Sequence, residues 1–290
     1  MSMRSILVPW WGGSTSTAQL DAALHIARRV EAHLDVVFVR PTLDDLANTL
    51  SSAVSPPSTL LRDMEPALHE AGTAAQASFA AWREANGVPD HVVNGQIRVP
   101  FAAWSERSGL PEQLILRRGR LVDMTVLRFP TLADALDRPH DAALFETGHP
   151  VLFVPNHVGR TPLSHVVVAW NGSLHSTRAV IGAMALLRAA ERVTILTTTD
   201  PSGQRGNPDA SGDMNLANAL SWHGIETSHR QLDSATTALG GALLQSAHDL
   251  NATLLVMGAA TRSRVSSAFL GRTTDHVFRN PPSIPVLMAH

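Results

Sequence analysis

The sequence predicts an α/β protein made of two tandem copies of one domain, and three observations indicate this. Short apolar runs rich in β-branched residues alternate with segments of helical periodicity, which is typical of open, mostly parallel sheets flanked by helices. The chain of 290 residues is about twice as long as a typical single domain. A strand, a glycine turn and a helix open the chain, and the same series returns near its middle.

The first half begins with a predicted βαβ unit. The apolar run at residues 6–11 ends at a glycine turn, and apolar residues at helical spacing follow over residues 20–30. The β-branched run at residues 34–39 suits a buried parallel strand. The later patterns of this half predict a helix at residues 60–86, strands at residues 92–99 and 123–127, and a closing strand within residues 149–154.

The second half repeats this plan, and its opening matches the first half at Trp, Gly and Ser. Trp11, Gly13 and Ser14 correspond to Trp170, Gly172 and Ser173, which follow the apolar run at residues 166–170 and lead into a helix that reaches Leu187. Further strands are predicted at residues 193–198, 225–232 and 253–257, and further helices at residues 214–223 and 236–250.

Local signals mark the ends of these elements and of the two domains. Gly224 is a good helix-terminating residue, and Thr236 is a candidate helix N-cap. The end of the chain, residues 284–289, resembles residues 149–154. Residues 155–164 are rich in turn formers and read as a linker, so we predict domains at residues 1–155 and 164–290.

The composition narrows the function classes. A formal net charge of -2 gives no basic surplus for nucleic acid or an anionic membrane. The absence of cysteine excludes disulfides, thiolate zinc sites and cysteine nucleophiles. The apolar start is too short for a signal peptide or a membrane span, so we expect a cytoplasmic protein with no nucleic-acid and no membrane partner. The histidines show no metal-ligand spacing, and no metal site is predicted.

A candidate anion site lies between a strand and a helix near the C-terminus. Gly258 follows the strand at residues 253–257 and allows a close backbone approach to a ligand. Gly271 and Thr273 lie near a helix N-terminus, whose N–H groups suit an anion. The arginines of this segment would add positive charge beside a phosphate or lie in solvent, and both interpretations stay open: Arg262, Arg264 and Arg272.

With these residues the sequence resembles the universal stress protein family, and in particular its tandem-domain members. The nucleotide-binding pattern of that family is Gly, two residues, Gly, nine residues, Gly, then Ser or Thr. Gly258 and Gly271 take the first and third glycine positions, Thr261 stands at the second, and Arg272 replaces the Ser or Thr directly before Thr273. The family's acidic residue after the first strand corresponds to Asn171, an amide that can still hydrogen-bond a ribose or a base edge.

The resemblance covers essentially the whole chain. It implies, in each half, a doubly wound, open, parallel five-stranded sheet of the Rossmann-like, adenine nucleotide alpha hydrolase-like kind. It also implies that the halves pack as an internal dimer through their last strands, residues 151–154 and 286–288. In the first half Arg128 and Phe129 stand where a glycine loop belongs, and no glycine lies between Phe129 and Gly148. We therefore expect the first half to be a structural partner, without an ATP site.

The resemblance implies a stress-responsive regulatory protein that binds ATP or a related adenine nucleotide, with Mg²⁺ accompanying ATP. It is expected to be no enzyme, or at most a weak ATPase, and a homodimer is an open alternative to the monomer. The nucleotide-binding residues would be Asn171, Gly172, Ser173, Gly258, Thr261, Arg262, Gly271, Arg272 and Thr273.

Other interpretations stay open beside this one. The chain could be a scaffold that binds no nucleotide and acts through protein contacts, or an adenylyl-transferring or hydrolytic enzyme on the same sheet. Trp11 and Trp170 could stack on a base, although packing under a loop is the simpler role. Ser14 and Ser173 lack the setting of a nucleophile, and turn or N-cap roles explain both.

Overall fold

The computed structural model describes residues 2–11, 17–45, 58–89, 100–130, 138–156, 163–198, 215–232, 239–260 and 271–290. The first half contains, in chain order, β1 (Ser5–Trp11), α1 (Ala18–Val30), β2 (His33–Arg40), α3 (Ser58–Ala85), β3 (Ala102–Ser108), α4 (Pro111–Arg118), the 3₁₀ turn η1 (Gly119–Leu121), β4 (Met124–Arg128), α5 (Arg138–Asp141), the π-helical turn η2 (Ala142–Glu146) and β5 (Val151–Val154). The second half contains β6 (Val166–Trp170), α6 (Leu174–Ala189), β7 (Val193–Thr198), α7 (Leu216–Ser221), β8 (Thr227–Leu232), α8 (Leu239–Asp249), β9 (Leu254–Gly258), α9 (Arg272–Arg279) and β10 (Val286–Ala289).

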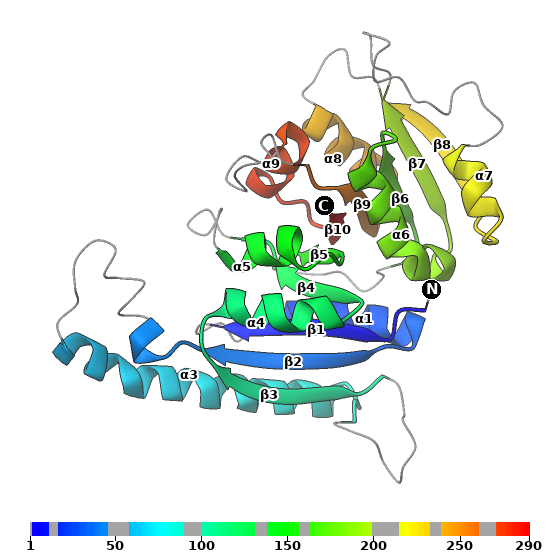
Figure 1. Ribbon diagram of the computed structural model, residues 1–290. Helices are drawn as coiled ribbons and strands as arrows, with labels where there is room; N and C mark the ends of the chain where they lie inside the picture. Colours follow the sequence, from blue (N-terminus) through cyan, green and yellow to red (C-terminus); the bar gives the residue numbers. More distant parts are fainter. Residues whose placement is uncertain are drawn as a thin grey trace.

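These strands form one continuous sheet in the order β3-β2-β1-β4-β5-β10-β9-β6-β7-β8 (Figure 1). Within each half all pairings are parallel, and the strand order is the same in both halves. The prediction of two doubly wound, parallel, five-stranded sheets is therefore confirmed. The two sheets are continuous with each other, which makes ten strands in all.

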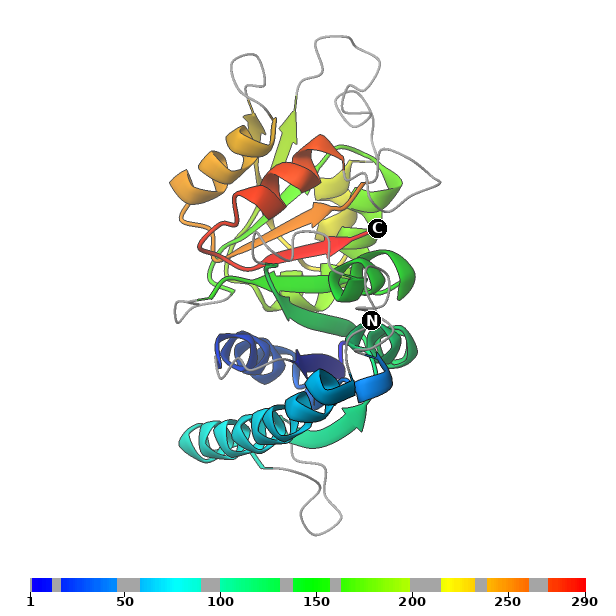
Figure 2. The same ribbon diagram turned by 90° about the vertical axis from the view of Figure 1, so that its left-hand side faces the viewer.

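The halves join through their last strands. β5 and β10 pair antiparallel, with Val286 opposite Phe153 and Met288 opposite Val151. Figure 2 shows the red β10 beside the green β5, between the two halves. The expectation that the halves meet through these strands is confirmed. The boundaries at residues 155 and 164 remain a prediction.

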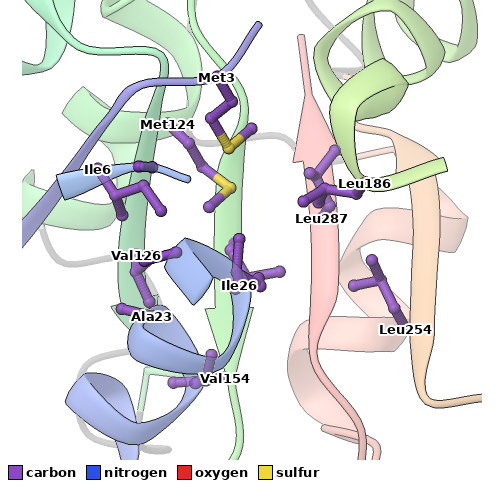
Figure 3. Close-up of a cluster of buried hydrophobic side chains, with 14 of the residues drawn as sticks. Met3, Ile6, Ala23, Ile26, Met124, Val126, Val154, Leu186, Leu254 and Leu287 are labelled. Carbon is purple, nitrogen blue, oxygen red and sulfur yellow. The ribbon is translucent and has the colours of Figure 1, made fainter. Parts of the chain in front are cut away.

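Helices cover both faces of the sheet. The buried residues of α1, α3, α6 and α7 share one apolar cluster, whereas those of α4, η2, α8 and α9 share another. The first cluster runs across the junction between the halves (Figure 3). Val126 and Val154 belong to the first half, Leu186 and Leu287 to the second, and all four are fully buried. The two halves therefore share a core.

Most predicted elements are found where the sequence placed them, within a few residues at their ends. The strand predicted at residues 92–99 lies outside the described residues, and the strand beside β2 is β3, which the patterns did not predict. β3 is an edge strand whose second half, from Glu106 to Ser108, is exposed, so it lacks the apolar alternation of a buried strand. Helix α4 was also missed.

Two local predictions have different outcomes. Gly224 has φ +74°, the left-handed conformation that ends helices, as its place after α7 suggested. Thr236, the proposed cap of the next helix, lies outside the described residues. Within the part of the chain that the structure describes, no helix is long and apolar enough to cross a membrane.

Candidate functional site

The candidate site lies where β6 and β9 end side by side. These strands pair in parallel, with Ala169 opposite Met257. The chain leaves β6 towards α6 on one face and leaves β9 towards α9 on the other. This is the point at which the strand order reverses, and ligands of doubly wound sheets bind outside the carboxyl ends of strands at such a point.

The turn before α6 is held by its own polar side chains. Gly172 has φ +71°, and the Oδ1 of Asn171 accepts the N–H of Ser173 at 3.2 Å. The Oγ of Ser173 then accepts the N–H of Ser176 at 3.2 Å, which makes Ser173 the N-cap of α6. The N-cap interpretation of Ser173 is confirmed, whereas Ser14 lies outside the described residues.

Asn171 differs from a carboxylate at this position in what it can offer a ligand. Its Oδ1 already accepts a hydrogen bond within the turn, and the residue is exposed. Its Nδ2 group has no partner among the described residues, and an amide nitrogen can only donate. Asn171 therefore suits an acceptor atom of a ligand, such as a ring nitrogen of a base.

Gly258 is required by the packing of α6. A Cβ atom at this position would lie 2.6 Å from the backbone nitrogen of Ser176 and 2.7 Å from the carbonyl carbon of His175. These atoms belong to backbone and cannot move independently of the helix. The glycine thus lets the first turn of α6 rest on the end of β9, a role that holds with or without a ligand.

The start of α9 is tied to the end of β9. The N–H of Gly271 donates to the carbonyl of Ala260 at 2.6 Å, and the N–H of Ala260 donates to Oγ1 of Thr274 at 3.3 Å. These two bonds bring together the residues on either side of positions 261–270, which the structure does not describe. The amide of Gly271 therefore already has an acceptor without a ligand, and the place of Gly271 in a nucleotide site stays a prediction.

The next three amides of α9 differ from that of Gly271. As first-turn N–H groups, those of Arg272, Thr273 and Thr274 have no acceptor within the helix, and none has one elsewhere among the described residues. The side chain of Arg272 is exposed, and no described carboxylate pairs with it. Asp275, the acidic residue of this turn, is paired with Arg279 at 3.0 Å. The positive end of the helix is thus left to an incoming anion.

Two helix N-termini therefore converge on one short segment. Gly258 touches the start of α6, and Ala260 is bonded to the start of α9. The first turn of α6 carries no acidic residue. Because both helices direct the positive ends of their dipoles at the end of β9, negative charge is favoured there.

A histidine pair beside this segment was not foreseen. His175, in the first turn of α6, stacks on His290 with ring centroids 4.5 Å apart, and Nδ1 of His290 contacts the carbonyl of Ala259 at 2.9 Å. Burial, followed by the nearby His290 and Arg178, lowers the pKa of His175. No sequence signal could have paired these rings, because α6 and the chain end meet only in the folded sheet.

Seven of the nine predicted site residues lie at the two helix starts: Asn171, Gly172 and Ser173 before α6, and Gly258, Gly271, Arg272 and Thr273 at β9 and α9. Thr261 and Arg262 lie outside the described residues, as does Arg264. Trp170 packs against the apolar cluster that contains α6. Trp11 packs against the apolar cluster on the opposite face of the sheet. Both tryptophans thus have the packing role.

The corresponding place in the first half is occupied by side chains. The Nε2 of the buried Gln19 donates to the carbonyls of Pro9 at 2.9 Å and Val126 at 2.6 Å, so it bridges β1 and β4 near their ends. Phe129 follows β4 and is buried. These contacts support the expectation that the first half is a structural partner.

No cation site is evident in the described ranges, where no three His, Asp or Glu side chains come together. Any Mg²⁺ bound with ATP would have to draw on phosphate oxygens and water, or on residues outside these ranges.

The strand order and the site place the chain among the doubly wound α/β proteins. Over its full length it is similar to a universal stress protein from Archaeoglobus fulgidus DSM 4304, with a TM-score of 0.64 and 17% identity, covering 100% of this chain and 99% of that one. A protein assigned to the universal stress proteins of Pseudomonas aeruginosa UCBPP-PA14 matches with a TM-score of 0.57 and 16% identity, over 99% and 93% of the two chains.

A third similar structure, of a protein of unknown function from Pseudomonas aeruginosa PAO1, has a TM-score of 0.54 and 15% identity, over 99% and 92% of the two chains. No protein-family model and no curated protein matches the sequence. At these identities the similarity concerns the fold: both halves of the chain have the fold of universal stress proteins.

Proposed function

We propose that the chain is a stress-responsive regulatory protein that binds ATP or a related adenine nucleotide at one site, in its second half. The fold similarity supports the choice of this class. One observation carries the proposal: the N-termini of α6 and α9 converge on residues 258–260, at the reversal point of the strand order.

The ligand's charge follows from this convergence. The amides of Arg272 and Thr273, which have no acceptor among the described residues, and the guanidinium of Arg272 offer donors to phosphate oxygens. Asn171, at the end of β6, lies where the nucleoside would reach and offers its Nδ2 as a donor. We assign no catalytic residue, because at the two helix starts no described histidine is hydrogen-bonded to a hydroxyl group that could act as a nucleophile.

A charge reversal at Arg272 tests the proposal. Arg272→Glu puts a carboxylate at the first position of α9, where negative charge favours the helix, so the variant should remain folded. Calorimetric titration should show one ATP per wild-type chain and about tenfold weaker binding to Arg272→Glu, since a charge-assisted contact is lost. Adenosine, which has no phosphate, should bind both proteins equally.

The matched control is His248→Glu. His248 lies on α8 of the same half with 80% of its side chain exposed, so the variant adds a negative charge away from the site. Its affinity for ATP should equal that of the wild type. Absence of heat with the wild-type protein, or equal weakening in both variants, would count against the proposed site.

A scaffold that binds no nucleotide is the second candidate, and the surface of α6 favours it. Leu174 and Ile181 are 61% and 55% exposed and, seven residues apart, lie on one stripe of the helix. Exposed apolar stripes can bind a partner. Mass spectrometry of the denatured protein decides between the two: an adenine nucleotide released from the purified chain excludes the scaffold without a ligand.

A further inference from the structure

The first half carries a bulky ring where the second half carries a small residue. β4 and β9 pair with the closing strand of their own half in the same way, Arg128 opposite Val154 and Gly258 opposite Ala289. Phe129 therefore occupies the position after β4 that Ala259 occupies after β9. Among the described residues, the first half thus presents a ring at the point where the second half presents a small side chain.

The ring of Phe129 is used to bind α9 of the other half. Phe278, near the end of α9, meets Phe153 of β5 edge-on with ring centroids 5.0 Å apart, and it meets Phe129 at 6.1 Å. Phe129 and Phe153 lie 5.7 Å apart. We call Phe129 and Phe153 the phenylalanine socket. Edge-on pairs at these separations are favourable beyond the area that they bury.

Helix α9 needs such support. It has only eight residues, and helices of this length are not stable without tertiary packing. Within its own half, Val277 is buried and His276 lies against Gly240, where a Cβ atom would come within 2.6 Å of the histidine. Phe278 adds an attachment to the first half, at the end of the helix opposite its N-terminus.

We propose that the phenylalanine socket positions α9 and thereby sets the affinity of the site at its N-terminus. The first half, without a site of its own, would then be the positioning partner of the site in the second half. This inference rests on the proposed function. Phe129 and Phe153 are positioning residues here, because they lie at the far end of α9 and reach the ligand only through the helix.

The experiment compares Phe129→Ala with Phe79→Ala in the full-length protein. Phe79 is a buried ring on α3 of the first half that stacks on Trp82 and Trp104, away from α9. Both variants replace a phenylalanine by alanine, and thermal unfolding shows whether each is folded at the assay temperature. Two quantities are measured: ATP affinity by calorimetry, and hydrogen exchange of the α9 amides in the ligand-free protein.

We expect Phe129→Ala to weaken ATP binding about tenfold, within the range of couplings between sites, and to speed amide exchange in α9. Phe129→Leu, which keeps much of the bulk, should restore part of both. Phe79→Ala should change neither. The inference is overturned if the wild type binds ATP and Phe129→Ala leaves both quantities unchanged, or if Phe79→Ala has the same effects.

If the proposed function is wrong, the same experiment gives a result that differs from a failure of the socket alone. A wild-type protein that binds no ATP removes the nucleotide site, and α9 exchange then decides alone: faster exchange in Phe129→Ala still supports the socket, and unchanged exchange overturns it.

Discussion

Gly258 determines how closely α6 can approach the sheet. In Gly258→Ala the new methyl group would meet the backbone of His175 and Ser176 at less than 3 Å, so α6 must shift. We expect the free energy of unfolding to fall by about 1–3 kcal/mol, as for other overpacked cores, and ATP binding to weaken. Urea denaturation measures the first effect.

Gly241→Ala is the control for this change. At Gly241, in α8, a Cβ atom would make only ordinary contacts with His276, at 3.7 and 3.8 Å. Because alanine favours helix over glycine, this variant should be neutral or more stable by up to about 1 kcal/mol. If Gly258→Ala were as stable as Gly241→Ala, the close approach of α6 would not require a glycine.

His165 makes the stability depend on pH. It is buried, with Nδ1 bonded to the carbonyl of Leu250 and Nε2 to Oγ1 of Thr194, both at 2.8 Å. Burial lowers its pKa, and the nearby Arg192 adds to this, although the hydrogen bond to Leu250 opposes it. The unfolded chain, with a histidine pKa of about 6.5, therefore binds the proton more readily than the folded protein.

The contribution of His165 to stability is consequently complete above about pH 6.5 and is lost as the pH falls below that value. His175 contributes to the pH dependence of stability in the same direction, because its pKa is also lowered. We expect the free energy of unfolding to fall less between pH 7 and 5 in His165→Asn than in the wild type. An equal slope in both proteins would contradict this explanation.

Substitutions at the N-cap of α6 test how much this cap stabilises the helix. Ser173 accepts the N–H of Ser176 and so closes the first turn of the helix. Ser173→Ala should lower the free energy of unfolding by about 1 kcal/mol, and Ser173→Asp should restore it, because aspartate also caps helices. If Ser173→Ala unfolds at the same urea concentration as the wild type, the cap contributes nothing to stability.

Patterns along the chain predicted helix ends where the determining contacts are local. The cap at Ser173 and the helix end at Gly224 depend on neighbours within a turn, and both were foreseen. The edge strand β3 was missed because its residues need not alternate between core and solvent. The burial of Gln19 was equally hidden, since its partner Val126 lies 107 residues away.

In the candidate site, too, local features were predicted from the sequence and long-range contacts were not. Its glycines and polar residues were found by their spacing, and the structure places seven of them at two helix starts. Their roles were less visible. Gly258 is required by its contact with α6, and the N–H of Gly271 donates to the carbonyl of Ala260. Both contacts form only when β6 and β9 lie side by side.

At the scale of the whole molecule, the two halves should unfold together. They share an apolar cluster and the β5–β10 pairing, and Arg29 of α1 bonds to the carbonyl of Ala189 at the end of α6. We expect a single transition in urea, with tryptophan fluorescence and circular dichroism coinciding. Two separated transitions would show that the halves are independent.

A substitution in the joining strand tests this coupling directly. Leu152 of β5 is fully buried, and Leu152→Ala should cost about 2–5 kcal/mol. Amide exchange should then speed up in β1 and in β6 alike. Leu121→Ala, at a residue that is 83% exposed, is the control and should change neither strand. Faster exchange in β1 alone would contradict a shared core.

The proposed nucleotide site is a single one, formed by the starts of α6 and α9. Amide hydrogen exchange of the full chain, with and without ATP, tests this most directly. ATP should slow exchange at residues 171–176, 258–260 and 271–275 and leave residues 128 and 129 of the first half unchanged. Protection at the first-half positions, or no protection at either helix start under saturating ATP, would contradict the account.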